Sequence, residues 1–235
     1  MSSKKDRNAD GKQDDSDGSM SESGTDASEY AWIPWYCSLK GNELFCEVVE
    51  SFAQDPFNLT GLSSQVPYYD YALDMILDIE PNEVLSEDQQ EMVENDAENL
   101  FGLIHARYIL TNRGLHAMCE KYRQGHFGKC PRVQCNEQPC LPVGITDTTN
   151  QESVKLYCPR CEEVYHSYSS RHLHIDGAYF GTTFPHLFFL TFPELKVPKC
   201  EEKYVPRVFG YKINKHAYTK SLQARKQQQS AAQAF

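Results

Sequence analysis

Four cysteines in two close pairs are the residues of this sequence best suited to chemistry. Cys130 and Cys135 are separated by four residues, Cys158 and Cys161 by two, and 22 residues lie between the pairs. Each pair can place two thiolates on one tight turn, and the spacer lets the turns face each other. Four thiolates complete the tetrahedral shell of zinc and leave no position for water. The spacing therefore predicts one structural Zn²⁺ per chain and favours a binding protein over a hydrolase.

The other thiols and the nearby histidines provide no second site of this kind. His172 and His174 are candidates for extra ligands, but four thiolates already complete zinc. A disulfide framework is the alternative interpretation, and the odd total of nine cysteines weighs against it. The five remaining cysteines lack paired spacing, so inert and buried thiols are expected. They are Cys37, Cys46, Cys119, Cys140 and Cys200.

Composition is typical of an intracellular globular protein. The 235 residues suit one domain or two small ones, and 40% of them are hydrophobic. No apolar run reaches the roughly 18 residues that a membrane span needs. The N-terminus has no hydrophobic signal region. Free thiolates also agree with a reducing compartment. We therefore expect a protein of the nucleus and cytoplasm with no membrane partner.

Charge is distributed unevenly along the chain. Residues 1–109 carry 6 Lys and Arg against 23 Asp and Glu, whereas residues 110–235 carry 17 against 10. An acidic surface repels nucleic acid and attracts basic proteins or polyamines. The basic residues near the cysteines form no dense stripe, so a solvated basic face is more probable than a nucleic-acid site. These residues are Lys129, Arg132, Lys155, Arg160 and Arg171.

The elements that would position the cysteines change type near Cys130. Before it, apolar residues recur every three or four positions from about Glu87 to Leu110, which predicts a long helix. Shorter helices are expected at 31–39, 67–80 and 115–125, with a break at 112–114.

After Cys130 the pattern favours strands. Short apolar runs, including 154–157 and 187–190, alternate with proline and glycine turns. They predict a small antiparallel sheet around the zinc. Residues 205–213 are expected to form a strand pair bent at Gly210.

Together these patterns predict an α+β chain, in which an N-terminal all-helical domain precedes a small antiparallel-sheet zinc ribbon and both tails are disordered. The predicted segments are an acidic tail at 1–29, a helical domain with an acidic loop at 30–126, a zinc ribbon at 127–203, a hairpin and C-terminal segment at 204–220, and a flexible tail at 221–235.

The sequence lacks the catalytic motifs of protein kinases, P-loop enzymes and G-x-S-x-G hydrolases. A kinase would need a glycine-rich loop, a strand lysine, an H-R-D loop and a D-F-G segment, and no such set occurs. A P-loop and a G-x-S-x-G elbow are also missing. We therefore expect no catalytic residues and no enzyme activity in this chain.

Acidic residues and serines supply further candidate sites. An acidic loop could bind basic ligands, although a solvated loop with helix-start charges is the simpler interpretation. Its residues are Asp78, Glu80, Glu83, Glu87 and Asp88. Ser19 and Ser23 each precede an acid by three residues, as an acidophilic kinase requires; unmodified serines are the alternative.

Aromatic residues flank Gly210 near the C-terminus. Alternation in a regular strand would put the rings of Phe209 and Tyr211 on one face. Such rings are usually core residues, but little sequence remains to cover them, so an exposed anchor for a partner protein is plausible.

Long segments of the chain resemble the regulatory beta subunit family of casein kinase II. The resemblance covers about residues 30–218. It rests on WIPWYC at 32–37, GNE at 41–43, FNLTGL at 57–62, ALDMILD at 72–78, GLIHARYILTNRG at 102–114, CPRV at 130–133, KLYCP at 155–159 and DGAYFG at 176–181.

The resemblance implies a non-catalytic homodimer whose zinc ribbons pack together. Such a dimer would bind two catalytic kinase chains, stabilise them and alter substrate choice. The four paired cysteines match the family's zinc ligands, and the acidic loop matches its polyamine-binding segment. The matching catalytic-subunit-binding hairpin supplies Arg207, Phe209, Tyr211, Lys212 and Ile213.

The chain also departs from the family pattern. Tyrosine usually precedes phenylalanine in the hairpin, and here the order is reversed. Gln134 and Cys140 stand where tyrosine and methionine are common, and Asn82 and Val84 replace usual acids. A free-standing zinc-ribbon adaptor, binding another protein or nucleic acid without a kinase, is the alternative function.

Overall fold

The computed structural model describes most of the chain, namely residues 31–80, 85–200, 205–212 and 214. Both predicted tails lie outside these residues. The predicted site residues outside them are Ser19, Ser23, Glu83 and Ile213. The described part contains helices and small antiparallel sheets, which confirms the α+β class. None of its helices has the length and apolar character needed to span a bilayer.

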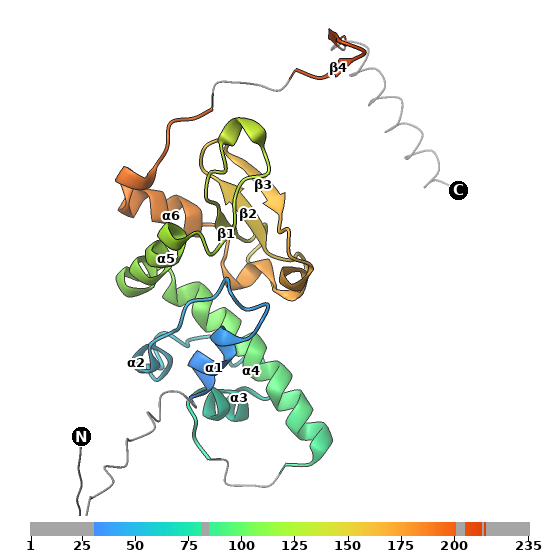
Figure 1. Ribbon diagram of the computed structural model, residues 1–235. Coiled ribbons are helices and arrows are strands. Elements are labelled where there is room, and N and C mark those ends of the chain that lie inside the picture. The colour runs from blue at the N-terminus through green and yellow to red at the C-terminus, as the bar shows by residue number, and fades with distance from the viewer. Residues whose placement is uncertain (1–30, 81–84, 201–204, 213, 215–235) are drawn as a thin grey trace, which may run out of the picture.

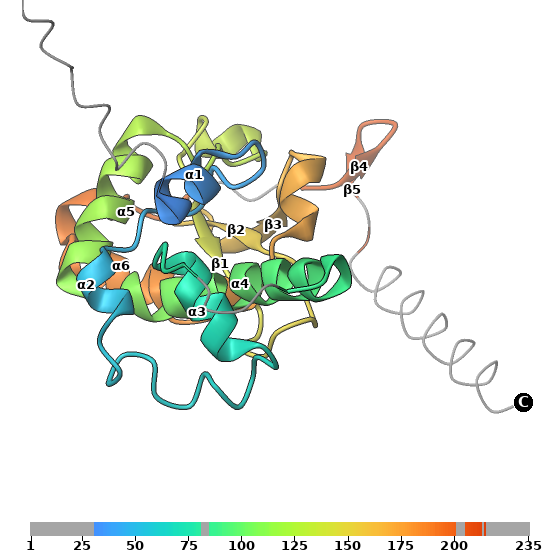
Figure 2. The same ribbon diagram turned by 90° about the horizontal axis from the view of Figure 1, so that it is seen from below.

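The first half of the described chain is helical, and its helices pack around the longest, α4 (Figures 1 and 2). They are α1 (Trp32–Ser38), α2 (Glu50–Ala53), α3 (Tyr69–Ile76), α4 (Glu87–Tyr108) and α5 (Asn112–Gln124). α4 begins with a capping box between Ser86 and Gln89, which satisfies two backbone N–H groups. Its buried stripe includes Leu100, Phe101 and Ile104.

The chain turns sharply between α4 and α5. The Thr111 hydroxyl accepts a hydrogen bond from the Gly114 N–H and caps α5. A Cβ on Gly114 would lie 2.1 Å from the Tyr108 carbonyl oxygen, so only glycine fits there. The break predicted at 112–114 is therefore wrong, because these residues already belong to α5. The helix ends at Gly125, in the left-handed conformation with φ 76°.

Short strands follow in the second half. β1 (Leu141–Val143), β2 (Lys155–Cys158) and β3 (Glu163–His166) form an antiparallel sheet in that order. Leu141 pairs with Tyr157 and Cys158 with Glu163. β4 (Arg207–Val208) and β5 (Tyr211–Lys212) form a separate hairpin. The 3₁₀ turns are η2 (Val133–Cys135), η3 (Ser170–His174), η4 (Gly177–Tyr179) and η5 (Pro193–Leu195).

The strand predicted at 187–190 is wrong, because these residues lie in helix α6 (Phe184–Thr191). An apolar run alone does not distinguish a buried helix from a buried strand. Pro185 stands in the first turn of α6, where proline is tolerated. Phe184 and Phe188, one helical turn apart, are both fully buried. The apolar residues of this run therefore belong to a helix that packs against α5 and β1.

One hydrophobic core joins the helices to the second half of the chain. Phe45 and Phe101, from the helical part, belong to the same buried cluster as Phe180 and Phe188. The Phe45 and Phe180 rings stack with centroids 5.4 Å apart. The sheet and its flanking turns are therefore held against the helices by aromatic packing as well as by chain connectivity.

His105 of α4 lies at the centre of this junction. Its Nε2 accepts a hydrogen bond from the Cys46 N–H at 3.2 Å, and its Nδ1 lies 2.8 Å from the Tyr179 carbonyl oxygen. These partners require the neutral ring with the proton on Nδ1. Complete burial lowers the pKa of His105 to about 4, so the neutral form persists at physiological pH.

We expect acid to destabilise the fold through His105. Its folded pKa lies below the ordinary value of about 6.5, so the unfolded chain binds the extra proton and stability falls as pH drops below 6.5. Between pH 7.5 and 5.5 the loss is about 1 kcal/mol. In His105→Gln the amide can replace both hydrogen bonds without titrating.

Denaturant unfolding of both proteins at several pH values, with saturating zinc, measures this difference. The wild type should have the steeper decline in unfolding free energy. Parallel curves for wild type and His105→Gln would contradict the assignment.

Candidate metal centre and docking hairpin

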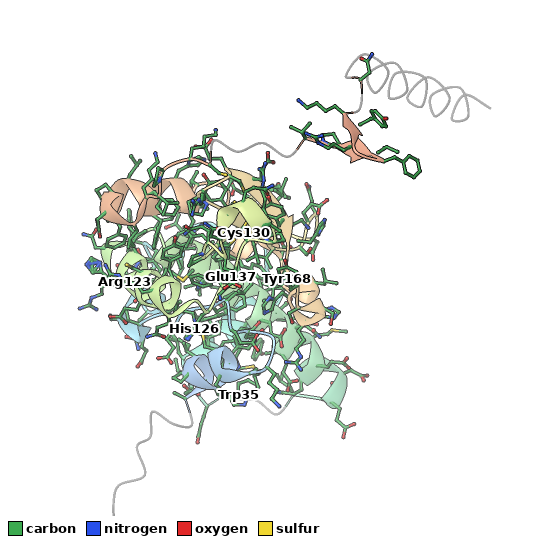
Figure 3. All side chains as sticks on the ribbon, turned by 45° about the horizontal axis from the view of Figure 1, so that its top comes forward. Trp35, Arg123, His126, Cys130, Glu137 and Tyr168 are labelled. Atoms are coloured by element: carbon green, nitrogen blue, oxygen red, sulfur yellow. The ribbon has the colours of Figure 1, made fainter. Side chains whose placement is uncertain are left out.

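The four paired cysteines come together in the fold. The Sγ atoms of Cys130, Cys135, Cys158 and Cys161 all lie within 4.8 Å of one another, and all four residues are buried. With Cys140 and Leu156 they form a small core of their own, separate from the main one. Among the described residues this is the one cysteine, histidine or acid cluster that could hold a metal ion. In Figure 3 Cys130 lies in the upper part of the molecule and Trp35 of α1 at its lower edge.

The first pair of thiols lies on a turn around η2. The Cys130 N–H donates to the Gln138 carbonyl at 2.8 Å, which closes the base of the turn. Cys135 is the last residue of η2, and Asn136 after it has φ 48°. Asparagine tolerates this left-handed conformation better than most residues, so the chain can reverse there. The turn brings Cys135 back toward Cys130.

The second pair lies on the turn between β2 and β3. Cys158 is the last residue of β2, and the Glu162 N–H donates to its carbonyl at 2.9 Å. This bond closes a tight loop that contains Cys161. The local hydrogen bonds thus place two sulfur atoms on each turn, as the spacing predicts.

The geometry fits a tetrahedral zinc ion. Zinc–sulfur bonds of about 2.3 Å place sulfur atoms about 3.8 Å apart in a tetrahedron. The Sγ atoms of Cys130 and Cys161 are 3.9 Å apart. Thiolates select thiophilic ions such as zinc over magnesium or calcium. Four protein ligands would also fill the coordination shell, so a metal here would stabilise structure.

Burial opposes charge on these thiols. Desolvation raises the pKa of Cys130 to about 11 and raises the pKa of Cys135 well above its ordinary value. A bound dication would reverse this preference and hold both as thiolates. The Arg132 N–H donates to Cys130 Sγ at 3.5 Å, and the Tyr165 hydroxyl lies 3.3 Å from Cys161 Sγ. These groups can stabilise negative sulfur.

Cys140 is a fifth thiol at this centre, and sequence spacing does not reveal it. Its side chain is fully buried in the same small core as Cys158, and its sulfur donates to the Gln138 carbonyl at 3.8 Å. The signal that would have found it is the strand register, because Cys140 directly precedes Leu141, which pairs with Tyr157 of β2. The two candidate histidines lie elsewhere: His172 contacts Ser167 and Glu43, and His174 is exposed.

The hairpin β4–β5 presents two exposed rings. Phe209 is 96% exposed and Tyr211 is 81% exposed. The strand pair predicted to bend at Gly210 is confirmed. Phe209 has φ 50° and lies with Gly210 in the turn, so the two rings do not alternate along one regular strand. The Arg207 guanidinium donates to the Gly210 carbonyl at 3.1 Å and braces the turn. Figures 1 and 3 show this hairpin apart from the body of the molecule.

Some acidic residues of the acidic loop have a structural role, and the others are simply exposed to solvent. Both Asp78 carboxylate oxygens accept from the Trp32 N–H at the start of α1. Glu87 and Asp88 occupy the first turn of α4, where negative charge is favourable. Glu80, like these two, is exposed. A hollow of about 330 Å³ beside the loop is lined by acidic and apolar residues.

Comparison with known proteins gives the same assignment along almost the whole described chain. The family model described as casein kinase II regulatory subunit matches residues 31–212. The chain belongs to the casein kinase II regulatory subunit family. This confirms the resemblance and the expectation of a regulatory, non-catalytic chain.

Relatives from distant organisms agree with the family match. The chain is 58% identical to casein kinase II subunit beta of Schizosaccharomyces pombe, over 85% of each chain. It is 53% identical to the Dictyostelium discoideum subunit beta, over 90% of this chain and 79% of the relative. Identity to the Drosophila melanogaster subunit beta' is 46%, over 86% and 92%. None of these comparisons favours the free-standing adaptor.

Loss of one ligand should empty the metal centre. We expect Cys135→Ala to purify without the stoichiometric zinc of the wild type, because three thiolates leave an incomplete shell. Residues 127–166 should lose protection from hydrogen exchange, since metal-binding energy is also folding energy.

Cys119→Ala is the matched control, because Cys119 is a buried thiol of the main core. It should keep one zinc per chain. Elemental analysis with hydrogen exchange makes the measurement. One equivalent of zinc retained by Cys135→Ala would contradict the assignment of the ligands.

Proposed function

We propose that this regulatory subunit binds the catalytic subunit of casein kinase II through the hairpin β4–β5. The observation that carries the proposal is the exposure of Phe209 and Tyr211 on a hairpin inside the family-matched region. Aromatic side chains are the commonest energetic anchors of protein interfaces. Two large rings left in water are costly for a free chain and favourable once a partner covers them.

Charged residues of the hairpin complement the rings. Arg207 and Lys212 face each other across β4 and β5 and are exposed. Such a basic pair beside aromatic anchors suits an apolar groove with an acidic or polar rim. The kinase chain would therefore gain its affinity from the rings and its orientation from the two cations.

A second copy of the chain is the proposed partner of the sheet face. Val133, Ile145, Val164 and Leu190 are exposed apolar residues around the metal centre and α6. The last three of these residues line a hollow of about 720 Å³ together with other residues of the sheet and α6, including Phe189. A self-complementary apolar face of this kind suits a twofold dimer. Two chains would then carry two structural zinc ions and bind two catalytic subunits.

Basic ligands such as polyamines, or basic substrates, are the proposed occupants of the acidic loop. Glu80, Glu87 and Asp88 leave negative charge exposed there, and the adjoining hollow is lined by Trp32 and Asp74 among others. An aliphatic polycation matches acidic and apolar groups side by side. A dimer that holds substrates near the kinase would alter substrate choice.

The distribution of the protein between nucleus and cytoplasm stays a prediction.

Removing both rings should abolish kinase binding. We expect Phe209→Ala with Tyr211→Ala to weaken binding to a casein kinase II catalytic subunit by roughly 100-fold or more, since each anchor contributes about 2 kcal/mol. Zinc content and unfolding free energy should stay unchanged, because both side chains are exposed. Titration calorimetry measures the affinity.

Phe57→Ala is the matched control, because Phe57 is an 83% exposed ring outside the hairpin. It should bind like the wild type. Wild-type affinity in the double variant would show that the hairpin is not the kinase-binding element.

A further inference from the structure

Cys140 immediately precedes β1, and extending the strand register by one residue places it opposite Cys158, the last residue of β2. Leu141 of β1 pairs with Tyr157 of β2, so the next pair along the antiparallel register is Cys140 with Cys158. The Cys140 N–H donates to the Gly128 carbonyl and therefore points away from β2. Cys140 and Cys158 thus form a non-hydrogen-bonded pair.

This class of pair has the spacing of a disulfide. Facing residues in non-hydrogen-bonded positions have Cα atoms about 4.5 Å apart and closely approaching side chains. Disulfides span Cα separations of about 4.4 to 6.8 Å. Both side chains belong to the same small buried core, and neither has any exposed surface. The backbone spacing of such a pair therefore suits a bond between the two sulfur atoms.

The position of Cys140 separates it from the other non-ligand cysteines. Cys46 and Cys119 belong to the main core, and Cys200 contacts the Gln134 carbonyl. Within the described residues, the core around the metal centre contains the four ligands and Cys140 as its thiols. Zinc with four thiolates leaves no coordination position for a fifth sulfur. Cys140 therefore lies in the same buried core as the candidate metal ligand Cys158, but the metal does not need Cys140 as a ligand.

We propose that Cys140 is a redox partner of the metal centre, and that oxidation by a peroxide joins it to Cys158 in a reversible disulfide that releases the metal ion. This inference rests on the proposed zinc site. Losing the Cys158 ligand leaves three thiolates, too few for a closed shell. Reduction by a cellular thiol would restore Cys158 and allow zinc to bind again.

The reaction proceeds in two balanced steps. The Cys158 thiolate attacks one oxygen of hydrogen peroxide, the O–O bond breaks, and a sulfenic acid and hydroxide form. The Cys140 sulfur then attacks the sulfenic sulfur, the S–O bond breaks, and the oxygen leaves as water with the Cys140 proton. The two sulfur atoms together lose two electrons, and one peroxide is reduced to water and hydroxide.

Another pair of thiols competes for oxidation. The Sγ atoms of Cys130 and Cys161 are 3.9 Å apart, and these two ligands are slightly more exposed than Cys158. A disulfide between them would remove two ligands at once and would not involve Cys140. The two routes therefore differ in the disulfide formed and in their dependence on Cys140.

Stepwise oxidation of the zinc-loaded full chain distinguishes the routes. Hydrogen peroxide is added to wild type, Cys140→Ala and the matched control Cys119→Ala. A chromophoric chelator reports zinc release, and mass spectrometry of unreduced peptides identifies the disulfide. We expect wild type and Cys119→Ala to release zinc together with a Cys140–Cys158 disulfide. Cys140→Ala should release zinc several-fold more slowly, and dithiothreitol should restore zinc binding to the wild type.

Two results would overturn the inference: equal zinc release from Cys140→Ala and wild type, or a Cys130–Cys161 disulfide as the main wild-type product. If Cys140→Ala does not hold zinc before oxidation, the wild-type peptide map alone decides between the two disulfides. A wild-type chain without zinc would instead refute the metal centre itself. Zinc-loaded wild type that forms no Cys140–Cys158 disulfide would refute this inference alone.

Discussion

Four thiols buried within 4.8 Å of one another are the constraint on which the second half of the chain depends. Burial disfavours their charged forms, and a dication favours them. The sheet around them has strands of three or four residues, too short to be stable alone. A metal ion at this centre would tie the η2 turn to the β2–β3 turn, and so would fix the sheet face on which the proposed dimer depends.

A second constraint joins this half to the helices. Neutral His105 links the Cys46 backbone to the Tyr179 backbone, and aromatic rings pack around it. Gly102 of α4 allows the Tyr179 ring to approach, since a Cβ there would lie 2.3 Å from that ring. The long helix and the second half of the chain therefore share one core, and the hairpin β4–β5 lies outside it.

Sequence patterns correctly predicted the elements and sites that are set by residues close together in the chain. The cysteine pairs, the long helix and the stop at Gly125 each follow from residues a few positions apart. Local patterns did not predict helix α6, because a short apolar run is equally compatible with a buried strand. Cys140 was taken for an inert thiol, since only the strand register brings it to Cys158. Asp78 looked like a ligand-binding acid, but its partner, the Trp32 N–H, is 46 residues away.

Native mass spectrometry of the full chain mixed with a casein kinase II catalytic subunit tests the central claim most directly. We expect a complex of two regulatory and two catalytic chains that carries two zinc ions. A zinc-loaded dimer that leaves the kinase unbound would contradict it, because the exposed rings of Phe209 and Tyr211 would then serve some other partner.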